Sequence, residues 1–172
     1  MPAESHLNNW LIMLNKIEAL PHFPGFLSFP FRLLPSKLHS KFLAILLNRI
    51  LLEQIKEGEL DFLNDRHLCI KVKDAGVSYD ISLSHGCFIS VKSSEVDLLI
   101  QSSVYDFLML AARQEDPDTL VFQRRLILQG DTELGLELKN FLDGLDIEST
   151  GSLAIIESML QKSLPAYRRL FS

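Results

Sequence analysis

Residues 115–143 constrain the fold of this chain more than any other stretch, because they hold a turn, a short strand and a capped helix with almost no residues between them. Asp116 can accept hydrogen bonds from the free backbone amides of a first helical turn, and Pro117 has no amide that would be left unpaired there. The sequence therefore predicts that a short helix or turn starts at this point and continues to Arg124.

A strand and a longer helix are expected next. Residues 125–129 are apolar on both faces and end at Gly130, which predicts a short strand buried on both sides. Asp131 or Thr132 then caps a helix that Gly144 is placed to end. The apolar residues of this helix recur every three or four positions and form one stripe, made of Leu134, Leu138, Phe141, Leu142 and Leu145.

The middle of the chain alternates between apolar and polar residues in short segments. This pattern predicts strands at residues 67–73, 77–83, 87–91 and 96–101, arranged as an antiparallel meander with one wet and one buried face. Ser102 or Ser103 then caps a helix that runs to Arg113. The complete order predicts an α+β fold, in which helices cover one face of a five-stranded, mostly antiparallel sheet.

Two segments before the first strand are more apolar than a plain core requires. Residues 41–56 are a predicted helix whose apolar surface is wider than the usual stripe of about 100°. Either the sheet and neighbouring helices cover this surface, or part of it lines a cavity that a lipid fills. Residues 20–35 hold four Pro and four Phe, and are either an extended arm packed on the domain or a partner, or a membrane contact. In the membrane interpretation the contacts are Phe23, Phe26, Phe29, Phe31, Arg32 and Lys37.

Charge and motifs exclude several classes of function. The net charge of −5 argues against nucleic-acid binding, although the chain up to Glu57 has six Lys or Arg against four Asp or Glu, as suits an anionic membrane surface. No hydrolase, dinucleotide or P-loop motif occurs, and the histidines lack metal-ligand spacing. We therefore expect no metal and no cofactor, and interpret Cys69 and Cys87 as reduced thiols of a cytoplasmic protein that lacks a signal peptide.

The charged residues near position 120 have simple structural interpretations. Asp116 and Asp131 are expected to cap helices, and Glu133 falls in a first turn where its charge suits the helix dipole. Arg124 and Arg125 point to opposite faces if they lie in a strand, so at most one of them meets a lipid phosphate. The alternative for that arginine is an ion pair with a nearby acid.

Three quoted stretches resemble one family. DPDTLVFQRRLILQGDTELGLELKNFLDGLD, with GELDFL at residues 58–63 and LNRILLEQI at residues 47–55, is similar to the UbiT proteins, accessory factors in ubiquinone biosynthesis built on a sterol carrier protein type two domain. The resemblance covers residues 43–146. It implies an apolar tunnel between sheet and helices, a prenylated ubiquinone precursor as cargo, and UbiU and UbiV as hydroxylase partners in the oxygen-independent branch of the pathway.

The sequence and the resemblance together predict a lipid-binding protein that is not an enzyme. The expected division is an N-terminal arm at 1–39, a sterol-carrier-like domain at 40–146 and a helical tail at 147–172. The bound molecule is an isoprenoid quinone precursor or a phospholipid. The residues predicted to line its site by their facing are Tyr79, Ile81, Leu83, Phe107, Leu108, Leu110, Ala111, Phe122, Leu134, Leu138, Phe141 and Leu142.

Two other classes of function stay open. One is a membrane-docking scaffold that holds partner enzymes together and has no lipid cavity. The other is an enzyme acting on a lipid, for which the sequence offers only Asp118 with His67 or Arg124 as a polar pair.

Overall fold

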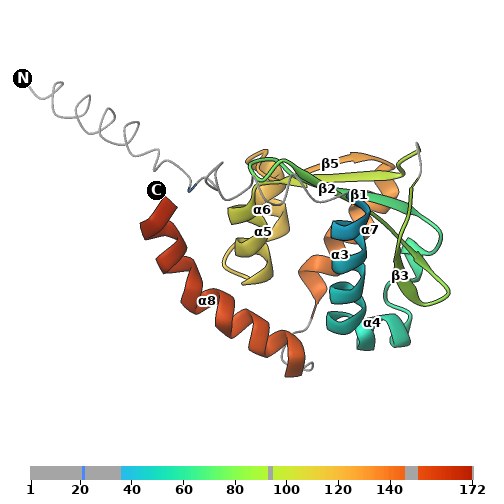
Figure 1. The fold of residues 1–172 in the computed structure, drawn as a ribbon, viewed down its shortest axis with the longest axis horizontal. Coiled ribbons are helices and arrows are strands. Elements are labelled where there is room, and N and C mark those ends of the chain that lie inside the picture. Colours follow the sequence, from blue (N-terminus) through green and yellow to red (C-terminus); the bar gives the residue numbers. More distant parts are fainter. Residues whose placement is uncertain (1–20, 22–35, 93–94, 146–150, 172) are drawn as a thin grey trace, which may run out of the picture.

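The computed structural model describes residues 21, 36–92, 95–145 and 151–171, and within them the predicted α+β architecture is confirmed. In Figure 1 the sheet runs along the top of the molecule and the helices lie below it, on one face. Five of the six predicted membrane contacts, Phe23, Phe26, Phe29, Phe31 and Arg32, lie outside the described residues, as does the side chain of Lys37.

The order of elements agrees with the prediction of a helix, four strands, two helices, a fifth strand and a helix. The elements are α3 (Ser36–Ile50), α4 (Leu52–Glu57), the 3-10 helix η1 (Asp61–Leu63), β1 (His67–Val72), β2 (Val77–Ser84), β3 (Cys87–Ser90), β4 (Leu98–Ser102), α5 (Val104–Ala111), α6 (Pro117–Phe122), β5 (Ile127–Gly130), α7 (Thr132–Gly144) and α8 (Gly151–Phe171).

The sheet is mostly antiparallel, but its first four strands do not form the predicted meander. The strand order is β3-β2-β1-β4-β5, and β4 runs parallel to β1, with Leu68 opposite Leu98. The other three pairings are antiparallel. The backbone amide of Asp97 donates to the carbonyl of His67 at 2.9 Å, so the chain returns to the start of β1 before β4 begins. Alternation identifies strands and their faces, but it does not identify their neighbours.

The last strand also differs from its prediction. β5 is an edge strand and is only partly buried, with Gln129 and Gly130 exposed. Leu126, which was expected inside a strand buried on both faces, is buried but lies just before β5, where its amide donates to the carbonyl of Leu120 at 3.0 Å. The apolar character of this segment therefore comes from a connection that packs into the core as well as from the strand.

The predicted helix at 41–56 begins earlier and bends near its end. Leu51 departs from helical geometry with φ −101° and ψ 22°, yet its amide still donates to the carbonyl of Leu47 at 2.8 Å. α3 packs against β2 and β3. The amide group of Asn48 bonds both the backbone N–H and the carbonyl of Phe88, at 2.7 and 2.8 Å, and the hydroxyl of Ser40 accepts from the amide of Asp80 at 2.9 Å. Polar side chains thus fix this apolar helix to one edge of the sheet.

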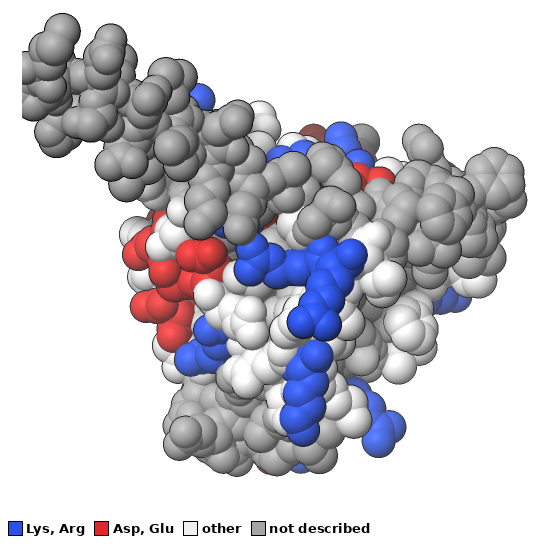
Figure 2. All heavy atoms as spheres, turned by 90° about the vertical axis from the view of Figure 1, so that its left-hand side faces the viewer, with Lys and Arg blue, Asp and Glu red and all other residues white. Residues whose placement is uncertain are grey.

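The last helix packs on α5. Leu164 is buried against Tyr105 and Ala112, and the rings of Tyr105 and Tyr167 are stacked with centroids 5.8 Å apart. The outward-facing residues of α8 include Lys162 and Arg169. Figure 2 looks onto this side of the molecule and shows a band of Lys and Arg side chains across its middle and a patch of Asp and Glu beside it.

Candidate functional site

A pocket of about 340 Å³ lies where the end of α5, the start of α6 and the end of α7 meet. Its apolar lining comes from Leu110, Pro117 and Leu142, of which the two leucines were predicted from their facing. Its polar lining, which sequence reasoning did not assign to a ligand site, consists of Arg113, Gln114, Glu115, Asp116 and Asp143. The pocket therefore combines an apolar part with a charged rim.

Half-buried apolar side chains continue from this pocket beneath the sheet. Phe107 and Leu110 on α5, Phe141 and Leu142 on α7, and Phe62 on η1 all pack against the main core cluster without being fully buried. The rings of Phe62 and Phe141 have centroids 6.3 Å apart. Since Leu110 and Leu142 belong to both groups, the apolar side of the pocket joins the partly accessible surface of the core.

The remaining predicted lining residues fall into three kinds of place. Ile81, Leu83, Leu134 and Leu138 are buried in the main core cluster, which also includes Leu68 and Leu98. Tyr79 and Leu108 pack into two smaller clusters. Ala111 is exposed, and the side chain of Phe122 is 90 % exposed. Phe107, Leu110, Phe141 and Leu142 are therefore the four predicted residues whose position best suits contact with a ligand.

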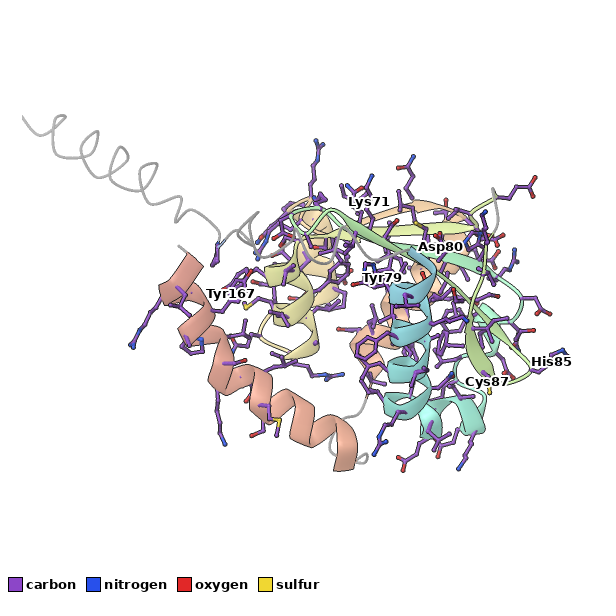
Figure 3. The ribbon with its side chains drawn as sticks, viewed as in Figure 1. Lys71, Tyr79, Asp80, His85, Cys87 and Tyr167 are labelled. Atoms are coloured by element: carbon purple, nitrogen blue, oxygen red, sulfur yellow. The ribbon has the colours of Figure 1, made fainter. Side chains whose placement is uncertain are left out.

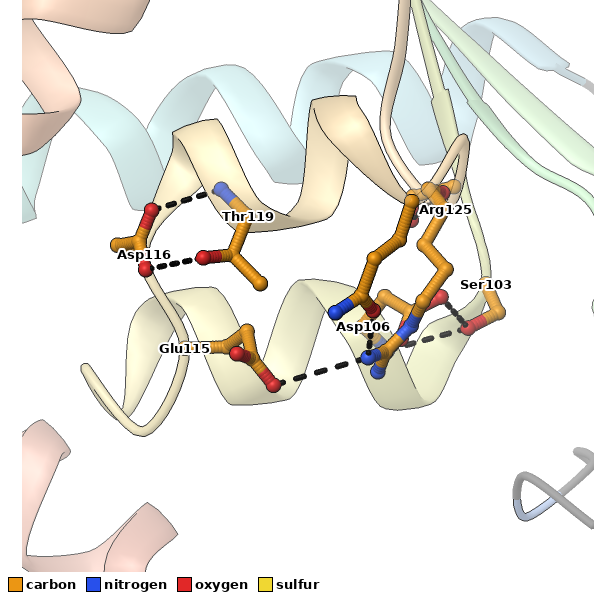
Figure 4. A network of polar contacts seen from close by, with 8 residues as sticks. Ser103, Asp106, Glu115, Asp116, Thr119 and Arg125 are labelled. Carbon is orange, nitrogen blue, oxygen red and sulfur yellow. Dashed lines mark hydrogen bonds and ion pairs between the residues drawn. The ribbon is translucent and has the colours of Figure 1, made fainter. Parts of the chain in front are cut away.

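Asp116 at the pocket rim and Asp131 outside it serve as helix caps, as predicted. Asp116 accepts from the backbone amide of Thr119 at 2.7 Å and from its hydroxyl at 2.6 Å (Figure 4). These bonds, that from the hydroxyl most of all, lower the pKa of Asp116 below its ordinary value. Asp131 caps α7 through the amides of Glu133 and Leu134. The cap of α5 is Ser103, whose hydroxyl accepts from the amide of Asp106 at 3.1 Å.

Arg125 takes the ion-pair alternative rather than meeting a lipid phosphate. Its guanidinium donates to the buried carboxylate of Asp106, with one N–H···O distance of 2.9 Å, and lies 3.6 Å from Glu115 (Figure 4). The hydroxyl of Ser103 donates to the other carboxylate oxygen of Asp106 at 2.8 Å. This network joins α5 to the segment that precedes β5.

The structure does not bring together the polar pair that the sequence offered for an enzyme. Asp118 makes an ion pair with Lys139 at 2.7 Å, and His67 lies 3.3 Å from Asp80. No ion pair joins Asp118 to His67 or Arg124 in the described part of the chain. Within the same residues no group of three His, Cys, Asp or Glu side chains could hold a metal ion, and no helix is long and apolar enough to span a bilayer.

The two thiols lie in different environments, which leads to a prediction. Burial, and next the carboxylate of Asp80, raise the pKa of Cys69 to about 11, whereas Cys87 is exposed at the β2–β3 hairpin (Figure 3). A raised pKa lowers the thiolate fraction at pH 8, so we expect an alkylating reagent to modify Cys69 at least about tenfold more slowly than Cys87. Mass spectrometry of peptides over a time course measures both rates, and equal rates would contradict the expectation.

Comparison with known proteins identifies the family. The SCP-2 sterol transfer family matches residues 46–143. The ubiquinone biosynthesis accessory factor UbiT from three strains of Escherichia coli is 38 % identical over 138 residues, which are 79 % of this chain and 79 % of each UbiT.

Two solved structures are similar at lower identity. One, described as a UbiJ-SCP2 ubiquinone synthesis protein, has a TM-score of 0.49 at 19 % identity, covering 59 % of this chain and 90 % of that one. The sterol carrier protein domain 2 of Helicoverpa armigera has a TM-score of 0.42 at 15 % identity, covering 61 % and 87 %. The family match and the UbiT identity suffice to place the protein: the chain belongs to the SCP-2 sterol transfer family, as a member of its UbiT type.

Proposed function

We propose that the protein is a non-enzymatic lipid-binding accessory factor in ubiquinone biosynthesis, which holds a prenylated quinone precursor beneath its sheet. The observation that carries this proposal is that Phe62, Phe107 and Phe141 and the two pocket leucines, on three separate elements, all pack against the main core cluster in half-buried positions. A core without a ligand function would gain stability by burying these large side chains completely.

The pocket and the aromatic surface suit the two ends of such a molecule. A prenyl chain packed against Phe107 and Phe141 would gain about 25 cal/mol for each Å² of apolar surface removed from water. The head ring would then lie at the pocket rim, where Arg113 and Gln114 offer hydrogen-bond donors. In this arrangement the chain is shielded while the ring remains accessible to a modifying enzyme.

The proposed role in ubiquinone biosynthesis rests on the similarity to the UbiT proteins. Relatives that share 38 % of their residues with the aligned part of this chain are named accessory factors of ubiquinone biosynthesis. The resemblance found in the sequence extends this to the oxygen-independent branch, with the UbiU and UbiV hydroxylases as partners. A cytoplasmic location with membrane association is proposed separately, from the composition of the chain and the excess of Lys and Arg in its N-terminal third. An accessory role fits a pocket in which two of the three acidic residues of the rim are already engaged, Asp116 in a helix cap and Glu115 in an ion pair with Arg125.

A pair of substitutions on α7 tests the proposed site. Leu142→Trp fills the pocket, whereas Leu136, which is 54 % exposed on the same helix, is the matched control as Leu136→Trp. We expect Leu142→Trp to lower the affinity for a fluorescent prenylated phenol at least about tenfold, since losing the burial of a large apolar group costs about 1.5–3 kcal/mol. The control should bind as the unchanged protein does.

The same pair separates the proposal from its alternatives. If Leu142→Trp binds the probe normally, the pocket is not the site. If neither the unchanged protein nor Leu142→Trp binds the probe, but partner enzymes still associate with both of them, the scaffold alternative is correct. Turnover of a prenylated phenol by the unchanged protein would show that it is an enzyme.

A further inference from the structure

Large apolar side chains are exposed on the two helices that flank β5. On α6, the side chain of Phe122 is 90 % exposed and that of Val121 is 37 % exposed, and on α7 Leu136 is 54 % exposed. A single exposed leucine needs no explanation, because folded proteins expose much apolar surface. An aromatic ring that is almost fully exposed is less usual, and if it lies beside other apolar groups it marks an interaction surface.

An ion pair places these side chains on one surface. The start of α6 and the end of α7 both line the pocket, and Asp118 on α6 pairs with Lys139 on α7 at 2.7 Å, so the two helices run in opposite directions. Phe122 lies one turn after Asp118 on the same side of α6, and Leu136 lies one turn before Lys139 on the same side of α7. Both side chains therefore extend from the ion pair in the same direction. Together they form the α6–α7 patch, which consists of Val121, Phe122 and Leu136.

The surroundings of the α6–α7 patch are mainly acidic. Glu133 and Glu137 are exposed and lie on the same side of α7 as Leu136. Residues 117–144, which span both helices, contain five Asp or Glu against three Lys or Arg. One of these cations, Arg125, already bonds the buried carboxylate on α5. An apolar patch with acids around it is complementary to a protein surface that carries Lys or Arg around an apolar recess.

We propose that the α6–α7 patch is the docking surface for the enzyme that modifies the bound head ring, and that Phe122 is its anchor. This choice of occupant rests on the proposed function, in which the pocket rim presents the ring. Asp118 of the ion pair lies two residues after Asp116, which lines that rim, so an enzyme seated on the patch has the ring within reach. A second copy of the chain is a poorer occupant, because it would bring acids against acids across the interface.

Binding of the purified UbiU and UbiV hydroxylases to the immobilised full chain, without lipid vesicles, tests the docking. We expect the unchanged protein to bind them, and Phe122→Ser to lower the affinity at least about tenfold, because truncating a central aromatic anchor removes a large share of the binding energy. Phe42→Ser is the matched control, since Phe42 of α3 is also exposed, to 69 %, and this variant should bind normally. Phe122→Ser should still bind a fluorescent prenylated phenol as the unchanged protein does, which shows that its fold and pocket are intact.

Charge variants test the expected basic surface of the partner. Glu137→Lys should slow the association of the hydroxylases by about twofold or more, because charges at the rim of an interface act mainly on the association rate. Glu57→Lys, at an exposed position of α4, is the matched control and should associate at the normal rate. Added salt should slow the unchanged protein in the same direction. An association rate that neither Glu137→Lys nor salt changes would contradict a basic partner surface.

Four further outcomes would overturn the proposal. They are no binding of the hydroxylases by the unchanged protein, equal affinities for Phe122→Ser and Phe42→Ser, loss of phenol binding in Phe122→Ser, and a dimer in sedimentation that Phe122→Ser dissociates. The third would assign Phe122 to the lipid site, and the fourth would show that a second copy covers the patch. The pocket variant Leu142→Trp should lose the phenol and still bind the hydroxylases, which keeps a failure of lipid binding distinct from a failure of docking.

Discussion

Replacing Gly130 by alanine is expected to lower the free energy of unfolding by about 3–5 kcal/mol, because backbone strain and overpacking each cost about 1–3 kcal/mol. Gly130 has φ +130°, where side chains are rarely tolerated, and a Cβ at this position would lie 2.2 Å from the carbonyl oxygen of Asp97. That oxygen is backbone and is held in place, since it also accepts from the amide of Asp131 at 2.8 Å. Neither the added Cβ of residue 130 nor the carbonyl oxygen of Asp97 can move away without opening the junction between β4 and β5.

Gly135 provides the control for this substitution. It lies in α7, where an added Cβ would meet Leu98 at 3.5 Å and Leu128 at 3.8 Å, both ordinary contacts. Gly135→Ala should therefore raise stability by about 0.5–1 kcal/mol through helix propensity. Thermal unfolding, monitored by circular dichroism, compares the two variants. A loss of about 1 kcal/mol lowers the melting temperature by about 2–4 °C in a chain of this size, so Gly130→Ala should melt about 10 °C below the unchanged protein. Equal melting temperatures for the two variants would contradict this account of the junction.

The second large effect is expected at Arg125. Arg125→Met removes the cation that faces Asp106, whose side chain is 5 % exposed, and leaves that carboxylate with the hydroxyl of Ser103. Breaking one side of a buried ion pair costs about 3–5 kcal/mol, because the remaining charge stays out of water without compensation. Urea denaturation should show the loss as a lower midpoint with an unchanged slope.

Two further variants separate the ion pair from the bulk of the side chain. Arg124→Met changes the adjacent, exposed arginine and should shift stability by less than about 0.5 kcal/mol. Asp106→Asn combined with Arg125→Met removes both charges and should recover much of the loss. If the double variant is as unstable as Arg125→Met alone, packing of the arginine stem and not the unpaired carboxylate explains the effect.

Local chemistry made the elements predictable. Caps at Asp116, at Asp131 and at Ser102 or Ser103 were expected, because short polar side chains before apolar helices satisfy free amides. In the structure Asp116, Asp131 and Ser103 accept such bonds. The faces of β1 and β2 followed from alternation, with Leu68, Ile81 and Leu83 buried. In these places a few neighbouring residues contain all the information that sets the conformation.

Long-range pairing was not predictable in the same way. Nothing in the alternation of Leu98 and Ile100 distinguishes a strand beside β3 from one beside β1, so the parallel β1–β4 pair was missed. Its cause is the return of the chain at Asp97, which bonds the backbone of His67 thirty residues earlier. The edge position of β5 was missed for the same reason, because its burial depends on which strand lies beyond it.

The candidate site was predictable in its apolar part only. Facing along the helices identified Leu110 and Leu142, because the apolar stripes of α5 and α7 both turn toward the sheet. Phe122 belongs to the same kind of pattern but lies at the end of a short helix, where little packs over it, and it is exposed. The polar rim at Arg113 and Gln114 depends on the backbone just after α5, where Arg113 has φ +50°. No local sequence motif predicts this conformation.

Native mass spectrometry of the purified protein tests the central claim of a lipid-binding interior most directly. The prediction is a complex with one lipid whose extracted component is an isoprenoid quinone precursor, and a bare chain for Leu142→Trp prepared in the same way. A bare mass for the unchanged protein, which persists after incubation with prenylated phenols, would contradict the claim.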